Sequence, residues 1–218
     1  MNMIIKRDKY LDELKGWKHT DLIKIVTGLR RCGKSFLLFN LFHQHLLSSG
    51  TDESHIIEIA LDDISNEALR EPFRMLEYVK SKIKDDNQYY LIIDEVQLLG
   101  RFVDVLNSFM HIDNVDIYVT GSNSRFLSKD VATEFRGRGI EIHIYPLSFA
   151  ELYQARGGDK YALWKSYYTY GELPYLASLN DNARKAEYLS SLNQTLYLKD
   201  IVERNKIANE DEFSELMN

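Results

Sequence analysis

The amino-acid sequence predicts an α/β fold, a three-layer sandwich in which helices cover both faces of a five-stranded parallel sheet, followed by a helical region. Short runs rich in β-branched and aromatic residues alternate with longer helical patterns through the first two-thirds of the 218 residues, as in right-handed βαβ crossovers. After Pro146 only helical patterns follow. The expected strands are residues 22–27, 55–61, 89–94, 116–121 and 140–145.

The composition is that of an ordinary globular protein, because 44% of the residues are hydrophobic and 28% are charged. The formal net charge of −6 argues against a protein that holds nucleic acid through its overall charge. No apolar run is long enough to span a bilayer, and the first ten residues lack the features of a signal peptide. We therefore expect a cytoplasmic protein without a membrane partner.

The first expected strand leads into the loop GLRRCGKS at residues 28–35. This loop matches the pattern G-x-x-x-x-G-K-[ST], in which glycines let successive backbone N–H groups turn toward phosphate oxygens. The helix expected at 34–48 adds its positive N-terminal end. A Gly-rich turn without a ligand is the alternative, but the position between a strand and a helix favours phosphate binding. The predicted nucleotide-binding residues are Gly28, Leu29, Arg30, Arg31, Cys32, Gly33, Lys34, Ser35 and Phe36.

Two residues of this loop carry specific chemistry. Lys34 is expected to contact the β- and γ-phosphates of ATP, and the Ser35 hydroxyl is expected to ligate Mg²⁺. Arg30 and Arg31 either touch the nucleotide or face solvent. Cys32, the single cysteine, cannot form an intramolecular disulfide, and we expect it to be a small packing residue rather than a reactive thiol.

The third expected strand ends in two carboxylates. It is a continuous apolar run, typical of a parallel strand buried on both faces, and helical patterns at 66–84 and 102–110 flank it. Ligands bind at the carboxyl ends of such strands. We therefore expect Asp94 to hold Mg²⁺ beside the loop, and Glu95 to act as the catalytic general base that polarises the attacking water. A solvated acidic turn is the alternative.

Two further sets of residues are candidates for the catalytic step. Thr120, Ser122 or Asn123, at the end of the fourth expected strand, would bind the γ-phosphate or orient the water; Ser122 and Asn123 are favoured over Thr120, and turn chemistry is the alternative. Arg136 and Arg138 precede the fifth strand and would neutralise charge on the departing phosphate. They act in the same chain or, in a homo-oligomer, on a neighbouring copy; a solvated basic segment is the alternative.

Several segments, in this order, together resemble one known family: GLRRCGKS, LIIDEVQ, VTGSNS, FRGR and IYPLSFAELY. The chain is similar to prokaryotic AAA+-type ATPases related to the archaeal ATPases, in which a P-loop ATPase domain precedes a poorly characterised helical C-terminal domain. GELPY and LYLKDIVERNKI resemble the start of that second domain.

The resemblance implies a sheet of order 5-1-4-3-2, ATP with Mg²⁺ as the ligand, Asp94 and Glu95 as the Walker B pair, and a sensor at the tip of the fourth strand. We expect an ATPase domain at residues 1–147 and a helical region at 148–218, comprising a lid and the truncated start of the second domain. Members of the family usually extend well beyond 218 residues.

Three functions fit the sequence. The first is an Mg-dependent ATP hydrolase that binds ATP and ADP and is coupled to a DNA or protein partner through the C-terminal region. The second is a slow nucleotide-gated switch, and the third is a small-molecule kinase, which needs a shaped acceptor pocket. Glu95 favours the hydrolase, because it supplies a carboxylate that can activate water.

Overall fold

The structure is a computed structural model that describes residues 4–121, 135, 137–171 and 173–193. The chain divides into two compact units. The first, called here the sheet unit, is Ile5–Pro146; the second, called the helical unit, contains Leu147–Asn218 together with Met1–Ile4.

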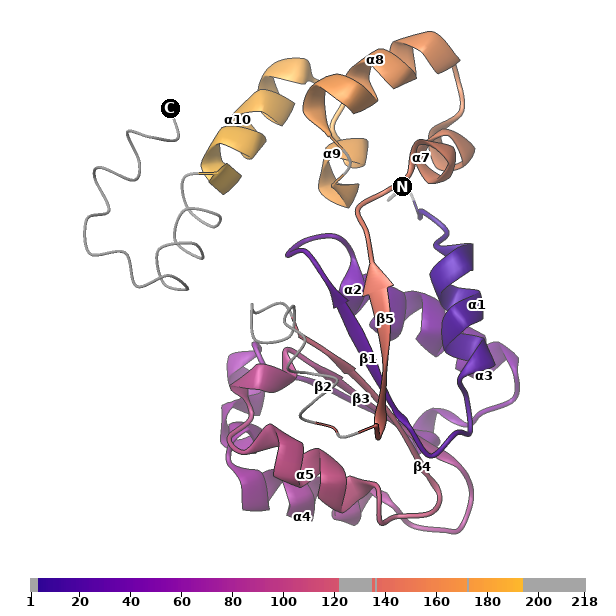
Figure 1. Ribbon diagram of the computed structural model, residues 1–218, viewed down its shortest axis with the longest axis vertical. Coiled ribbons are helices and arrows are strands. Elements are labelled where there is room, and N and C mark those ends of the chain that lie inside the picture. The colour runs from indigo at the N-terminus through magenta and orange to yellow at the C-terminus, as the bar shows by residue number, and fades with distance from the viewer. Residues whose placement is uncertain (1–3, 122–134, 136, 172, 194–218) are drawn as a thin grey trace, which may run out of the picture. The chain divides into compact units, whose positions relative to one another are not determined.

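The described part of the sheet unit contains five parallel strands in the order β2-β3-β4-β1-β5 (Figure 1). This is the expected order 5-1-4-3-2 counted from the other edge, so the predicted fold class is confirmed. The strands are β1 (Ile23–Gly28), β2 (Ile56–Ala60), β3 (Tyr89–Asp94), β4 (Val115–Thr120) and β5 (Gly139–Ile144).

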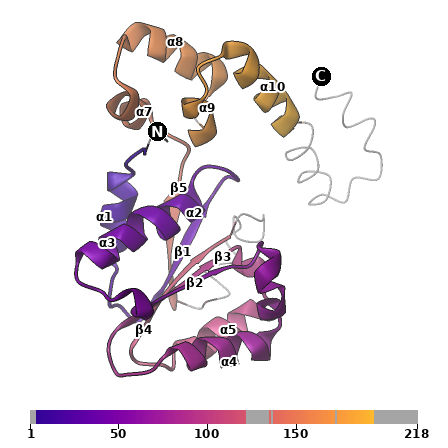
Figure 2. The same cartoon turned by 180° about the vertical axis from the view of Figure 1, so that it is seen from behind.

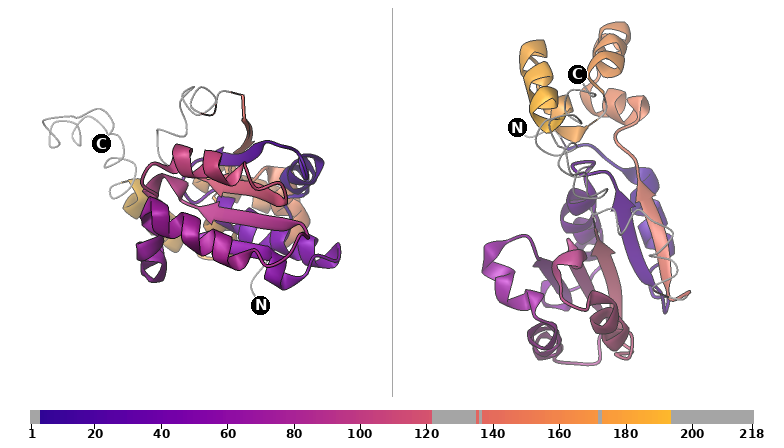
Figure 3. Two further views of the ribbon diagram at one scale, coloured as in Figure 1. Left: turned by 90° about the horizontal axis from the view of Figure 1, so that it is seen from below. Right: turned by 60° about the vertical axis from the view of Figure 1, so that its left-hand side comes forward.

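Helices lie on both faces of this sheet, with α1 and α3 on one face and α4 and α5 on the other (Figures 1 and 3). The segment expected to be helical at 34–48 is continuous, with a π-helical middle. The helices are α1 (Asp8–Gly16), α2 (Lys34–Phe36), η1 (Leu37–Phe42), α3 (His43–Ser48), η2 (Glu53–His55), η3 (Ile64–Arg70), α4 (Pro72–Lys82), η4 (Val96–Leu98) and α5 (Phe102–Phe109).

The helix expected over 66–84 is divided in two at Glu71. Glu71 has extended backbone angles, because Pro72 disfavours the helical conformation of the residue before it. Pro72 then occupies the first turn of α4, where its missing N–H is not needed, and the Glu71 carboxylate accepts from the Arg74 N–H. Local proline chemistry therefore ends η3 and begins α4.

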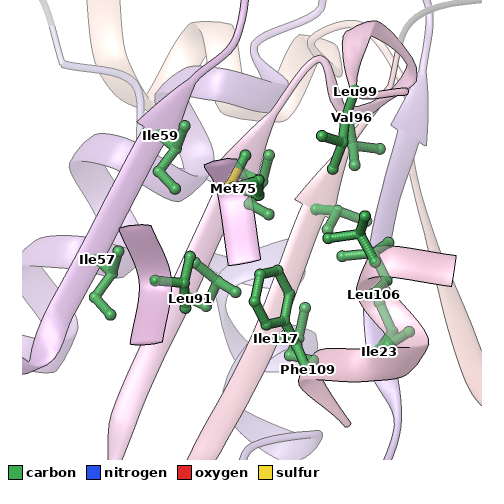
Figure 4. Close-up of a cluster of buried hydrophobic side chains, with 14 of the residues drawn as sticks. Ile23, Ile57, Ile59, Met75, Leu91, Val96, Leu99, Leu106, Phe109 and Ile117 are labelled. Atoms are coloured by element: carbon green, nitrogen blue, oxygen red, sulfur yellow. The ribbon is translucent and has the colours of Figure 1, made fainter. Parts of the chain in front are cut away.

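Two apolar clusters fill the space between the sheet and its helices. Because side chains alternate along a strand, Leu91 and Ile93 of β3 face α4 and α5, while Tyr90 and Ile92 face α1 and α3. Figure 4 shows the first cluster, in which Met75 and Phe109 pack on strand side chains. Burial of β3 on both faces explains why its sequence has no polar alternation.

In the described part of the helical unit, four helices follow one another: α7 (Phe149–Arg156), α8 (Lys160–Tyr170), α9 (Pro174–Ser178) and α10 (Asn182–Leu192) (Figure 2). Capping residues set where they begin. Ser148 and Glu151 form a capping box, and Asp159 and Asp181 accept hydrogen bonds from the first turns of α8 and α10. In the described part of the chain, no helix is both long and apolar enough to cross a membrane.

A buried ion pair between Lys24 and Asp116 joins β1 to β4. Lys24 has no exposed surface, and its ammonium donates to the Asp116 carboxylate and to the Thr20 carbonyl at 3.1 Å. Asp116 also accepts from the His19 N–H at 3.0 Å and from the Tyr118 hydroxyl at 2.9 Å. Burial lowers the pKa of Lys24, and the Asp116 charge opposes that shift. Removing either residue would leave the other charge buried without a counter-charge.

We expect Asp116→Asn to lower the free energy of unfolding by about 3–5 kcal/mol, because it leaves the Lys24 ammonium buried without a counter-charge. The double variant Lys24→Met with Asp116→Asn should recover most of that loss. Urea unfolding followed by circular dichroism measures both. A single variant as stable as the unsubstituted protein would contradict this account.

Candidate nucleotide-binding site

The loop between β1 and α2 has a backbone that requires glycine. Gly28 and Gly33 have φ values of 140° and 101°, and Arg31 is also left-handed at 64°. A Cβ atom added at Gly28 would meet the Ile144 carbonyl oxygen at 2.2 Å and the Cys32 sulfur at 3.1 Å. The first of these atoms belongs to the backbone of β5, so the loop is pressed directly against that strand.

Lys34 opens the helical segment that follows the loop, and only 5% of it is exposed. Its ammonium donates to the carbonyl oxygens of Gly28 at 3.1 Å and Leu29 at 2.9 Å. The charge therefore lies within the turn of the loop itself. An anion seated on the loop would meet this ammonium together with the N-terminal end of the helix.

Asp94, the last residue of β3, is 4% exposed and lies beside the loop. Its carboxylate accepts a hydrogen bond from the Thr120 hydroxyl and is hydrogen-bonded to the Ser35 side chain. Burial raises the pKa of Asp94, and these two hydrogen bonds oppose the shift. Ser35 and Asp94 thus bring together a hydroxyl and a buried carboxylate, which are the oxygen ligands that Mg²⁺ prefers.

Glu95 has left-handed backbone angles, with φ 52° and ψ 47°. Its N–H donates to the Thr120 hydroxyl oxygen at 3.2 Å, and its carboxylate accepts from the side-chain amide of Gln97. The Thr120 hydroxyl therefore joins the two acids, since it donates to Asp94 and accepts from the backbone of Glu95. Non-glycine residues in this conformation are uncommon and cluster at functional sites.

The other loop residues divide between surface and interior. Leu29 and Phe36 are 46% and 38% exposed, Arg31 is exposed and Arg30 is half-buried. Cys32 is fully buried, and its thiol lies 3.6 Å from the Ile144 carbonyl oxygen. Burial raises the pKa of the Cys32 thiol, which agrees with a packing role rather than a reactive one.

The structure does not bring Arg138 to the loop. Its carbonyl accepts from the Ile23 N–H at the amino end of β1, and its guanidinium donates to the Asn107 side chain at 3.3 Å. The loop begins at Gly28, at the opposite end of β1 from Ile23. A strand rises about 3.3 Å per residue, so these two residues, five positions apart, are separated by on the order of 17 Å. Ser122, Asn123 and Arg136 lie outside the described residues.

Arg7 is a residue of the loop's surroundings that the sequence analysis missed. Only 3% of it is exposed, and its guanidinium donates to the carbonyls of Cys32 at 3.0 Å and Tyr145 at 2.6 Å. It also lies over the Tyr10 ring, whose hydroxyl accepts from the Tyr145 N–H at 3.2 Å. Arg7 and Tyr10, one turn apart near the start of α1, therefore fasten the loop to the end of β5.

Replacing Arg7 by Met should lower the free energy of unfolding by about 2 kcal/mol or more, because two carbonyls near the loop lose a charged donor. Lys6→Met is the matched control, since Lys6 is the adjacent basic residue and is exposed. Urea unfolding of both variants measures the difference. Equal stability of the two variants would show that Arg7 does not hold the loop in place.

Comparison with known proteins agrees with this fold. A family model described as an AAA domain matches residues 20–153. An uncharacterized protein of Haemophilus influenzae is 31% identical over 207 residues, which cover 92% of this chain and 51% of that protein. An uncharacterized protein of Methanocaldococcus jannaschii is 29% identical over 215 residues, which cover 90% of this chain and 45% of the relative. The chain thus spans about half the length of these relatives.

Two solved structures share the fold at low sequence identity. A Walker-type ATPase of Pyrococcus abyssi superposes with a TM-score of 0.59 at 16% identity, over 93% of this chain and 76% of the other. Hsp104 of Saccharomyces cerevisiae, in a complex with casein, superposes with a TM-score of 0.57 at 15% identity, over 82% of this chain and 36% of the other.

Proposed function

Because the chain belongs to the AAA domain family, we propose that it binds ATP with Mg²⁺ in the loop Gly28–Ser35 and hydrolyses it. The observation that supports this most directly is the convergence of Lys34, Ser35, Asp94 and Glu95 at the carboxyl end of the parallel sheet. These residues lie on two separate segments of the chain, 34–35 and 94–95. Their side chains supply the cation, the metal ligands and the base that phosphoryl transfer to water requires.

In this proposal the loop binds the triphosphate. The backbone N–H groups of Gly28–Ser35 and the Lys34 ammonium hold the β- and γ-phosphates, so Lys34 exchanges its present carbonyl partners for phosphate oxygens. Ser35 and Asp94 would hold Mg²⁺, which neutralises charge on the phosphates. The residues fit the ion, because a buried carboxylate with a raised pKa gains a counter-charge from it.

Glu95 is the proposed catalytic base. The Thr120 hydroxyl fixes its backbone, and its carboxylate can orient a water for attack on the γ-phosphate once Gln97 releases it. We retain Asn123 as a proposed water-orienting residue. Thr120 is a positioning residue, because its contacts go to the two acids rather than to the loop.

In this proposal an arginine neutralises the charge that develops on the departing phosphate. Arg138 lies at the amino-terminal edge of the sheet, so it would serve a neighbouring copy rather than its own loop. Arg136 stays a candidate beside it. Hydrolysis would then depend on a homo-oligomer, with residues 1–147 as the ATPase domain and residues 148–218 directed to a DNA or protein partner.

One observation favours a slow nucleotide-gated switch as the second candidate. The Glu95 carboxylate is already engaged by the Gln97 amide, so the base must be released before it can accept a proton from water. A protein in which that release depends on a partner would bind ATP and turn it over slowly.

Lys34→Ala should weaken ATP binding about tenfold or more, because it removes a charged donor to the phosphates. Calorimetric titration with Mg-ATP measures the dissociation constant. Lys80→Ala is the control, since Lys80 is an exposed lysine on α4. Equal affinities in the two variants would remove Lys34 from the binding site.

Glu95→Gln should reduce phosphate release from Mg-ATP about a hundredfold or more and leave ATP affinity nearly unchanged, because only the proton acceptor is lost. Glu67→Gln, at an exposed position, serves as the control. Release that persists in Glu95→Gln would exclude this residue as the base. If the unsubstituted protein binds ATP and releases no phosphate, the switch replaces the hydrolase.

A further inference from the structure

The helical unit contains a cavity of about 590 Å³ that the proposed ATPase chemistry does not use. It lies among the end of α7, the length of α8 and the start of α10. Its lining includes three basic side chains. The residues that matter here are Arg156, Lys165, Ser166, Thr169, Asn180 and Lys185.

Lys185 is the central group of this cavity, because it is buried and no carboxylate among the described residues forms an ion pair with it. Its exposed fraction is 4%, and its ammonium donates to the Ser166 hydroxyl at 2.7 Å and lies 5.5 Å from the centre of the Tyr170 ring. Among the described residues, no carboxylate oxygen lies within 4.0 Å of this ammonium. Burial, and then the like charge of Arg156, lower the pKa of Lys185.

The remaining charges of the cavity do not compensate for Lys185. Arg156 is exposed and donates to the Asn180 side chain at 2.6 Å, a neutral partner. Asp159 is the carboxylate among the described lining residues, and it accepts from the N–H groups of Tyr161 and Ala162 at the start of α8. Three cations therefore face one carboxylate that is already bound to the backbone.

We propose that this cavity binds a phosphate group, held by Lys185, Arg156 and the Ser166 hydroxyl. The charges of Arg156 and Lys185 repel each other. An anion bound between them would attract both side chains and offset that repulsion. Arginine and lysine donors make their strongest hydrogen bonds to such charged oxygens. The volume is within the range of small-molecule pockets, so the phosphate has room to carry a larger group.

The phosphate can come from a free nucleotide or from the backbone of a single-stranded nucleic acid. Helix α8 carries Lys165 in the cavity, and Trp164 and Tyr168 on its adjoining surface, where they are 47% and 63% exposed. Exposed aromatic rings beside a basic groove are the usual means of stacking unpaired bases. The test therefore uses both sources.

The experiment is calorimetric titration of the Lys34→Ala protein, in which binding at the phosphate loop is weakened, with ATP and separately with a single-stranded dT oligonucleotide. We expect saturable binding of at least one ligand, and about tenfold or greater weakening when Arg156→Gln or Lys185→Gln is added. Weakening of ATP binding identifies a nucleotide site. Weakening of oligonucleotide binding identifies a backbone-phosphate site.

Lys160→Gln is the matched control, because it removes the same charge from an exposed position on α8 outside the cavity. If Lys185→Gln does not fold, Arg156→Gln decides, since Arg156 is exposed. The proposal is overturned if neither ligand binds, or if Arg156→Gln weakens binding no more than Lys160→Gln does. The same titrations are repeated with Arg156→Gln in a protein that retains Lys34. If Lys34→Ala weakens ATP binding and Arg156→Gln does not, ATP binds at the loop and not in this cavity.

Discussion

The contact between the loop Gly28–Ser35 and the backbone of β5 is the constraint on which the rest of the candidate site depends. Gly28 is paired with Ile144 in the sheet, and even a methyl group on Gly28 would overlap the Ile144 carbonyl. Cys32 fills the space beside this contact, and Arg7 ties the loop to the next residue, Tyr145. The conformation of the loop is thus set by the neighbouring strand as well as by the loop's own glycines.

The parallel strand order brings the other residues of the candidate site together. β1, β3 and β4 are neighbours in the sheet and end at the same edge, so Ser35, Asp94 and Thr120 meet although 85 positions separate the first from the last. A single hydroxyl, that of Thr120, then fixes the relative positions of the two acids. Each of the two carboxylates also accepts a hydrogen bond from a protein side chain, Asp94 from Thr120 and Glu95 from Gln97.

The sequence predicts what local chemistry determines. The spacing of Gly28, Gly33 and Lys34 and the uninterrupted apolar run before Asp94 are local signals, and they were enough to predict the fold class and to bring the loop and the acids together. Arg7 could not be found in this way, because its partners are 25 and 138 positions away. The contacts of Thr120 with both acids depend on side-chain directions, which the sequence does not contain. The buried Lys24 and Lys185 likewise need tertiary partners to be interpreted.

The left-handed backbone of Glu95 has a thermodynamic consequence. A side chain in this conformation costs about 1–2 kcal/mol, which glycine would largely avoid. Backbone strain alone would therefore favour glycine at this position. The chain instead carries a glutamate at this strained position, so this turn retains a carboxylate at a cost in conformational stability.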